Sequence, residues 1–175
     1  MKRVLAVGFA MVWAASGGAH AEPLTPVYSS IQNCTPLPRL ELPGRTIVRT
    51  EATAAARCRG VGGFDLAVVE EDTRSWLAVI APGGVHPLNR AMVQEFRHGH
   101  FPTITDNKVV EWRVDGQGQP RALIVRVHFT DPDMPATSPA ARKSLLMVFD
   151  LRALPPRLAG TAPDNAGARR VADGE

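Results

Sequence analysis

The chain has 175 residues, of which 20 are basic and 17 acidic, and 45% are hydrophobic. This length suits one domain with its own hydrophobic core, and the apolar content excludes a chain that is disordered throughout. Without Lys2 and Arg3 there are 18 basic residues against 17 acidic ones, a net charge of +1, and the basic residues are scattered, so the composition predicts no nucleic-acid binding.

The first 21 residues have the features of a secretory signal peptide. Lys2 and Arg3 form a short basic start, Val4–Ala15 is an apolar run, and Ala19-His20-Ala21 is a typical cleavage site. The apolar run is shorter than the roughly 20 residues that a membrane-spanning helix needs. The sequence therefore predicts a mature chain that begins at Glu22, lies in the periplasm or outside the cell, and has no transmembrane segment.

The elements predicted after the signal peptide are short at first. Prolines exclude a long helix in Glu22–Pro43, where Val27–Ile31 fits a short strand or a single turn. Arg45–Thr53 carries β-branched residues and is typical of a strand. The alanines that follow, Ala54–Ala56, are compatible with a helical turn.

The exported chain has two cysteines, Cys34 and Cys58. In an oxidising compartment they most simply form one structural disulfide, which closes a loop of about 25 residues and contributes roughly 3.5 kcal/mol in the chain-entropy model. A redox pair normally has the spacing Cys-x-x-Cys, which is absent, and a nucleophilic cysteine would leave the other cysteine unpaired. We therefore predict a structural Cys34–Cys58 bridge.

Three glycines follow the second cysteine in Cys58-Arg59-Gly60-Val61-Gly62-Gly63. Such a cluster marks a tight bend or a close approach of the backbone. A phosphate-binding loop is the functional alternative, but that motif needs a strand before the glycines and a helix after them. Here Phe64–Glu71 is typical of a strand, so we interpret the glycines as a disulfide-anchored turn that leads into the core.

The middle of the chain is predicted to form a hairpin followed by a helix. The strand Phe64–Glu71 is joined by a polar turn to the return strand Ser75–Ile80. Leu88–Arg97 is predicted to be a helix because Leu88, Met92 and Phe96 fall four residues apart on one face, with Asn89 as its potential cap.

The clearest predicted strands come last, in Val109–Asp115, Arg121–Thr130 and Ser144–Arg152. Apolar and polar residues alternate along each of them, which predicts one buried and one solvated face. On this basis Trp112 is buried, and Glu111 and Arg113 form an exposed ion pair.

The alternation ends near Leu154. Residues 155–175 are mostly small, polar or charged, so we expect a disordered tail and a single domain over residues 22–154. Short strands joined by turns predict a mainly β fold, an antiparallel sandwich or partly open barrel with one short helix and one disulfide.

His98 and His100 are the candidate metal ligands. On a strand their rings would point the same way, as metal ligands must, and His86 or His128 could add a third ligand. The alternative is a surface loop after the helix, since zinc needs three or four converging ligands.

The candidate carboxylates are Glu70, Glu71 and Asp72, which cluster at the predicted hairpin turn. Paired carboxylates can serve acid–base chemistry on sugars, although a solvated turn is the simpler interpretation. Asp65 is either a buried acid paired with an arginine or an outward position of its strand, and we favour the second. No nucleophile elbow, Ser-x-x-Lys or His-Glu-x-x-His motif is present.

Four segments together resemble a family of small exported proteobacterial proteins of unknown function. They are Tyr28-Ser29-Ser30-Ile31 before Cys34, the Cys-x-Gly-x-Gly-Gly turn from Cys58, Glu111-Trp112-Arg113, and Ala122-Leu123-Ile124-Val125-Arg126. The resemblance covers most of Val27–Phe129 and does not include His98 or His100. It implies export, a disulfide and a β-rich fold, and it implies no activity.

The resulting hypothesis is a non-catalytic binding or accessory module of the cell envelope, without a cofactor, whose partner is an unidentified envelope ligand or protein. One alternative is a hydrolase of envelope polymers that uses Glu70 or Glu71. The other is a metal-binding protein that uses His98 and His100.

Overall fold

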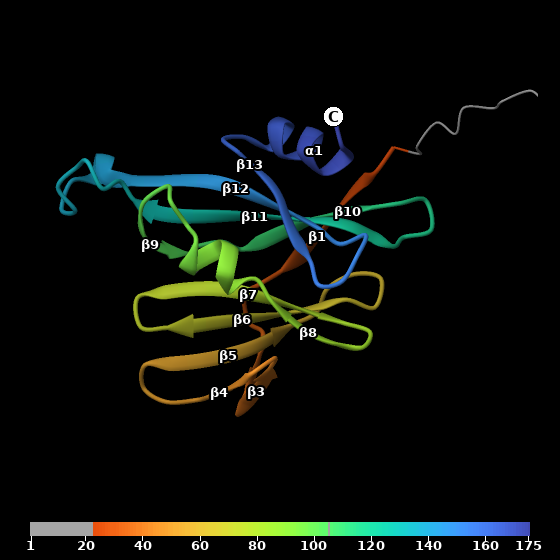
Figure 1. Ribbon diagram of the computed structural model, residues 1–175, viewed down its shortest axis with the longest axis horizontal. Coiled ribbons are helices and arrows are strands. Elements are labelled where there is room, and N and C mark those ends of the chain that lie inside the picture. The colour runs from red at the N-terminus through yellow and green to blue at the C-terminus, as the bar shows by residue number, and fades with distance from the viewer. Residues whose placement is uncertain (1–22, 105) are drawn as a thin grey trace, which may run out of the picture.

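The computed structural model describes residues 23–104 and 106–175, so the expected signal peptide lies outside the described residues. Two antiparallel β-sheets pack face to face, one helix covers the outer face of the upper sheet, and a small hairpin lies below the lower sheet (Figure 1). The predicted mainly β, sandwich-like fold is confirmed, and the described strands do not close into a barrel.

The upper sheet, called sheet A, has the strand order β1-β10-β11-β12-β13, and β9 pairs with the part of β11 that β10 does not reach. Its strands are β1 (Thr25–Ser30), β9 (His100–Thr103), β10 (Val109–Val114), β11 (Pro120–Thr130), β12 (Arg142–Asp150) and β13 (Arg157–Ala162). The three strands predicted from alternation correspond to β10, β11 and β12. A hairpin loop over residues 115–119 joins β10 to β11.

The lower sheet, sheet B, has the order β2-β5-β6-β7-β8. Its strands are β2 (Thr35–Leu37), β5 (Thr53–Cys58), β6 (Asp65–Glu71), β7 (Arg74–Ala81) and β8 (Gly84–Pro87). The expected helical turn at Ala54–Ala56 is wrong, because these alanines lie in β5, where Ala55 pairs with Leu37 on one side and Val69 on the other. The hairpin of β3 (Arg39–Leu42) and β4 (Arg45–Val48) packs beneath sheet B.

The core lies between the two sheets, where the inward residues of each strand meet. Its largest fully buried side chains include Trp112, Phe149, Leu66, Leu77 and Met147. The predicted disulfide is confirmed: Cys34 and Cys58, whose Cα atoms are 4.6 Å apart, join the segment before β2 to the end of β5. A disulfide of this kind suits an oxidising compartment.

The predicted helix at Leu88–Arg97 is reduced to one π-helical turn, η1 (Arg90–Gln94). Leu88, Met92 and Phe96 are buried, as their spacing predicts. The backbone N–H of Leu88 donates to Leu77 O, so this residue still belongs to the edge of sheet B and the helix cannot begin there. The side chain of Asn89 makes no capping bond, contrary to expectation.

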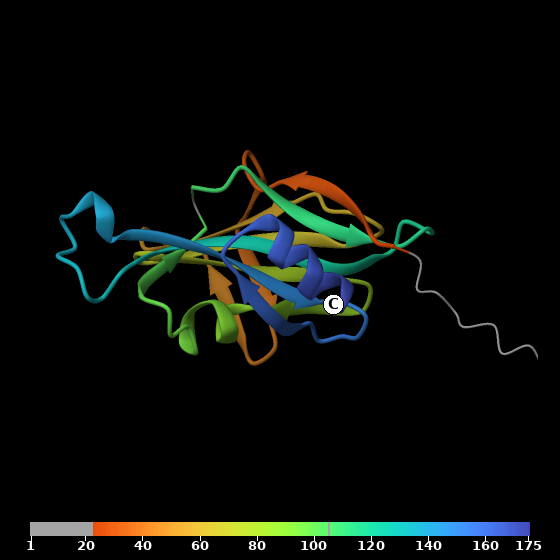
Figure 2. The ribbon, with the colours of Figure 1, turned by 90° about the horizontal axis from the view of Figure 1, so that it is seen from above.

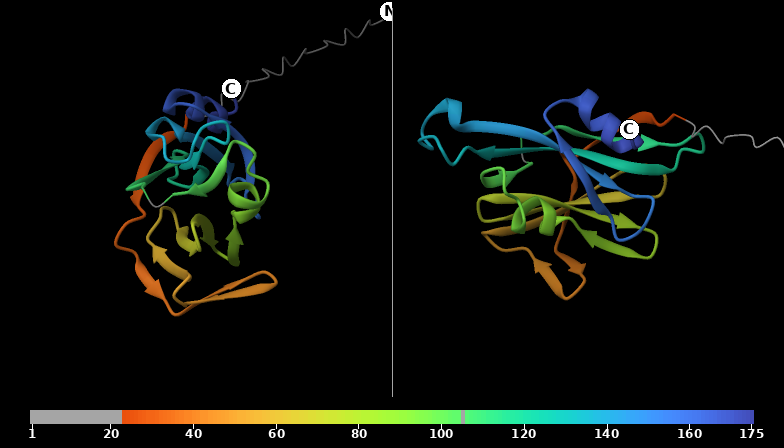
Figure 3. Two further views of the ribbon diagram at one scale, coloured as in Figure 1. Left: turned by 90° about the vertical axis from the view of Figure 1, so that its left-hand side faces the viewer. Right: turned by 45° about the horizontal axis from the view of Figure 1, so that its top comes forward.

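The expected disordered tail is wrong, and the domain extends to the last helix. Strand β13 pairs with β12, and α1 (Asn165–Asp173) packs across the outer face of sheet A (Figures 2 and 3). Small side chains on α1 permit this close packing, and the apolar cluster beneath it comprises Ala122, Ile124, Leu146, Val148, Ala162, Ala168 and Ala172. A short helical turn, η2 (Pro139–Ala141), precedes β12.

Candidate functional site

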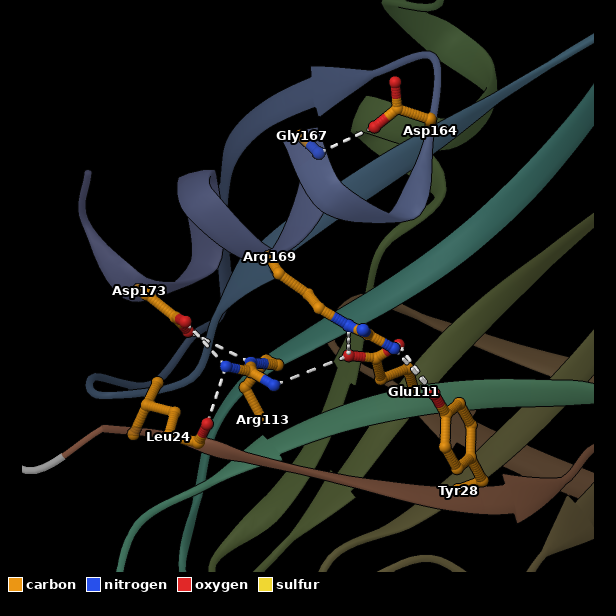
Figure 4. Close-up of polar contacts among 8 residues, drawn as sticks. All are labelled: Leu24, Tyr28, Glu111, Arg113, Asp164, Gly167, Arg169 and Asp173. Atoms are coloured by element: carbon orange, nitrogen blue, oxygen red, sulfur yellow. Dashed lines mark hydrogen bonds and ion pairs between the residues drawn. The ribbon is translucent and has the colours of Figure 1, made fainter.

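Glu111 is the centre of a charged network that fastens α1 to sheet A (Figure 4). Its carboxylate accepts hydrogen bonds from Arg169 Nε at 2.8 Å and Arg169 Nη2 at 2.9 Å. The hydroxyl of Tyr28 donates to the same carboxylate at 3.2 Å. Because the Glu111 side chain is only 8% exposed, its charge depends on these partners.

Arg113 extends the network to both ends of the described chain. Its Nε and Nη2 donate to the carboxylate of Asp173 at 3.0 and 2.6 Å, and Nη2 also donates to Leu24 O at 2.6 Å. Its Nη1 lies 3.7 Å from Glu111. Arg113 therefore ties the segment before β1 to the end of α1 (Figure 4).

The expectation of an exposed Glu111–Arg113 pair is wrong. Both residues do alternate with the buried Trp112, as predicted, but α1 covers the face on which they lie, and their side chains are 8% and 6% exposed. Two carboxylates and two guanidinium groups balance one another in this network. The hydrogen bonds to Glu111 and its negative charge raise the pKa of Arg169, which therefore stays charged.

A cleft of about 400 Å³ opens beside this network on the outer face of sheet A. Buried Ile124 and Leu146 contribute apolar atoms to it, whereas Tyr28 and Val109 are each about half exposed. The complete lining consists of Tyr28, Asp106, Asn107, Lys108, Val109, Glu111, Ile124, Arg126, His128, Leu146 and Asn165. This combination of exposed apolar atoms and convergent polar groups is typical of a ligand-binding cleft.

Asn107 and His128 form a fixed polar pair within the cleft. The Asn107 amide donates from Nδ2 to Arg126 O, which leaves Oδ1 as the acceptor for His128 Nε2 at 3.2 Å. Burial lowers the pKa of His128; the positive charges of Arg126 and Arg142 lower it further, and Asp106 acts in the opposite direction. The imidazole is therefore neutral at neutral pH.

The glycine turn lines a second cleft of about 540 Å³, in which Asp65 already occupies the backbone N–H of Gly60 and the guanidinium of Arg57. Gly60 N donates to Asp65 Oδ1 at 3.0 Å, and Arg57 Nη2 donates to Asp65 Oδ2 at 2.6 Å. Partial burial raises the pKa of Asp65, yet these two partners lower it more, so the net shift is downward. Asp65 is thus paired with an arginine, as the less favoured alternative states, but it is half-buried rather than buried.

Close packing explains the glycines better than phosphate binding does. A Cβ on Gly60 would lie 2.2 Å from Phe64 O and 2.9 Å from Trp112 Cζ2. One on Gly62, whose φ is +59°, would lie 2.5 Å from Pro120 Cδ. The turn therefore packs closely against the core residue Trp112 and the β10–β11 hairpin. This agrees with the interpretation of the glycines as a disulfide-anchored turn that leads into the core.

The structure does not bring the candidate metal ligands into one set. His98 and His100 are exposed and lie against Phe96 and Phe101, respectively. His128 lies on β11 and is hydrogen-bonded to Asn107. Among residues 23–104 and 106–175, no group of three or more His, Cys, Asp or Glu residues could hold a metal ion.

In the acidic turn, Glu71 is held by structural contacts. Arg45 binds both of its carboxylate oxygens at 3.1 Å, and Trp76 Nε1 donates to one of them at 2.8 Å. Glu70 and Asp72 are exposed, and Asp72 adopts a positive φ of 56° at the turn. Glu71 thus joins the β3–β4 hairpin to sheet B.

Comparison of the chain with known protein families, with curated proteins and with solved structures finds no match. In the part of the chain that the structure describes, none of the helices has the length and apolar character needed to cross a membrane. Asn107, Lys108 and Arg126 were not among the candidates from the sequence. Asn107 and Lys108 precede the predicted strand Val109–Asp115, Arg126 lies on a face predicted to be solvated, and none of the three belongs to a motif.

Proposed function

We propose that this protein is an exported, non-catalytic binding module of the cell envelope and that its ligand occupies the cleft beside α1. The observation that carries the proposal is the lining of this cleft, in which half-exposed Tyr28 and Val109 stand next to fixed polar groups. Apolar contact supplies affinity in such a cleft, and the polar groups select the ligand.

The state of the carboxylates supports binding rather than hydrolysis. General acid–base catalysis needs a carboxyl group that can reach the substrate and change its protonation state. Both oxygens of Glu111 accept hydrogen bonds from Arg169, and Asp106 is paired with Arg142. The disulfide is consistent with export.

Thermal unfolding of the mature, oxidised chain tests this proposal, with a panel of muropeptides, lipids, anionic sugars and divalent metals. A ligand at 100 times its Kd adds about 2.7 kcal/mol, which raises the Tm of a domain of this size by roughly 5–10 °C. Val109→Trp should block the cleft and abolish this shift. Val48→Trp is the matched control, because Val48 is equally exposed but lies on β4.

Three results would contradict the proposal. An equal Tm shift in Val109→Trp and in the unmodified chain would place the ligand elsewhere. Release of a cleaved product from any muropeptide or sugar, abolished by Glu71→Gln or Glu70→Gln, would establish the hydrolase instead. A shift with a divalent metal that is abolished by His98→Ala would favour the metal-binding alternative.

A further inference from the structure

We propose that the ligand of the cleft beside α1 is an anion, with a carboxylate or phosphate group held between Lys108 and Arg126. This inference rests on the proposed function and adds the chemical class of the ligand. Carboxylate and phosphate share the features that matter here, a negative charge and several acceptor oxygens.

The cations of the cleft are less fully paired than its acids. In residues 23–104 and 106–175, the ammonium of Lys108 has no hydrogen bond or ion pair. Within the described part of the chain, the guanidinium of Arg126 has only the hydroxyl of Ser144, at 3.1 Å, as a partner. A guanidinium has five N–H donors, so most of the donors of Arg126 remain available to a ligand.

The acids of the cleft, in contrast, have their own cations. Asp106 is paired with Arg142, and Glu111 is held by Arg169 and Arg113. The positive charges of Lys108 and Arg126 are therefore not cancelled by these two carboxylates, and we infer a local positive potential in the cleft.

Neutral hydrogen-bonding groups lie next to these cations. The Asn107–His128 pair lies in the same cleft, and the carbonyl of Arg126 fixes the Asn107 amide. Burial is the main cause of the lowered pKa of His128; Asp106 opposes the shift, and the positive charges of Arg126 and Arg142 add to it. A bound anion would compensate the repulsion and favour protonation of the imidazole.

Matched probes test the inference on the mature, oxidised chain. Glucuronate is compared with glucose, and glycerol 3-phosphate with glycerol, by titration of backbone and side-chain amide NMR signals. We expect the anionic probes to shift the signals of Asn107, Lys108 and His128 in a saturable manner, and the neutral probes to leave them unchanged. The two anionic arms distinguish a uronic-acid sugar from a phosphorylated headgroup as the source of the anion.

Charge-removing variants then locate the site. Lys108→Gln and Arg126→Gln should each weaken binding of the preferred anion about tenfold, the loss of one charged contact. Lys143→Gln is the control, because it makes the same change of net charge at an exposed lysine on β12. It should leave the affinity unchanged.

The outcomes separate this inference from the proposed function. If glucose or glycerol binds in the cleft as tightly as its anionic counterpart, the anion assignment is wrong while the binding function stands. An anion that binds equally well to all three charge variants also overturns the assignment. If the thermal panel yields a ligand whose effect survives Val109→Trp, the proposed function itself is wrong, and this inference falls with it.

Discussion

Glu111→Gln tests whether the charged network holds α1 on sheet A. The substitution keeps the size of the side chain and removes its charge, which leaves Arg113 and Arg169 near each other with Asp173 as the remaining acid. Removing one partner of a buried ion pair costs about 3–5 kcal/mol. Arg169 is 37% exposed and can be hydrated, so we expect the lower end, about 3 kcal/mol.

Urea unfolding measures this loss. With a slope of roughly 2 kcal/mol per M, the midpoint should fall by about 1.5 M, and the Tm by roughly 6–12 °C. Glu95→Gln is the matched control, since the Arg90–Glu95 pair has the same 2.8 Å separation as Arg169–Glu111 but side chains that are 78% and 55% exposed. It should cost less than about 1 kcal/mol.

Hydrogen exchange shows where the loss occurs. The amides of α1 should lose protection in Glu111→Gln before those of β6 and β7, because the network joins the helix to the sheet and does not extend between the two sheets. A Glu111→Gln chain within about 1 kcal/mol of Glu95→Gln, with α1 still protected, would refute the reasoning. The helix would then be held by its small apolar side chains alone.

Three further predictions concern the turn, the disulfide and pH. Gly60→Ala should cost about 2–3 kcal/mol in urea unfolding, because its Cβ would meet the backbone oxygen of Phe64; an unchanged midpoint would contradict this. Replacing Cys34 and Cys58 by serine should cost roughly 3.5 kcal/mol, as should reduction of the unmodified chain, measured by the same assay. The pKa of His128 is lowered in the folded state, so the unfolded state binds more protons and stability should fall as pH decreases below about 6.5 until the folded pKa is passed. This part of the pH dependence should be absent in His128→Gln. If it persists in that variant, another titrating group causes it.

The sequence predicted the sheets well where alternation was strong. In β11 and β12 the apolar positions Leu123, Val125, Met147 and Phe149 all face the core. Alternation is a direct consequence of strand geometry and needs no knowledge of the partner strand. The disulfide could be predicted equally well, because two cysteines allow only one intramolecular pairing.

Short elements were predicted less well because their conformation depends on their neighbours. Ala54–Ala56 has no strand preference of its own, and it is extended because β5 lies between β2 and β6. The segment around Met92 has helical spacing, but the edge of sheet B holds Leu88 and leaves room for one turn. Neither constraint can be read locally from the sequence.

The two most consequential errors of prediction, the disordered tail and the exposed Glu111–Arg113 pair, have a single cause. Glu111 and Arg113 were expected to be exposed because the tail was expected to be disordered, and an ordered α1 buries them. Signals for this helix were nevertheless present: Asp164 caps it by accepting from Gly167 N at 2.7 Å, and Gly174 ends it with a φ of 84°.

Those signals were outweighed because the apolar face of α1 consists of small residues, Ala168 and Ala172 with the partly buried Val171. A helix of this kind buries little apolar surface, so its docking depends on the charges at Glu111 and Arg113. The same helix leaves the far part of the outer face of sheet A open, where Arg126 and His128 line the cleft. Helix α1, the segment with the weakest sequence pattern, therefore forms one border of the candidate site. To predict a site of this type from sequence, one must recognise a short helix of small apolar residues and match it to charged residues on a strand that it could cover.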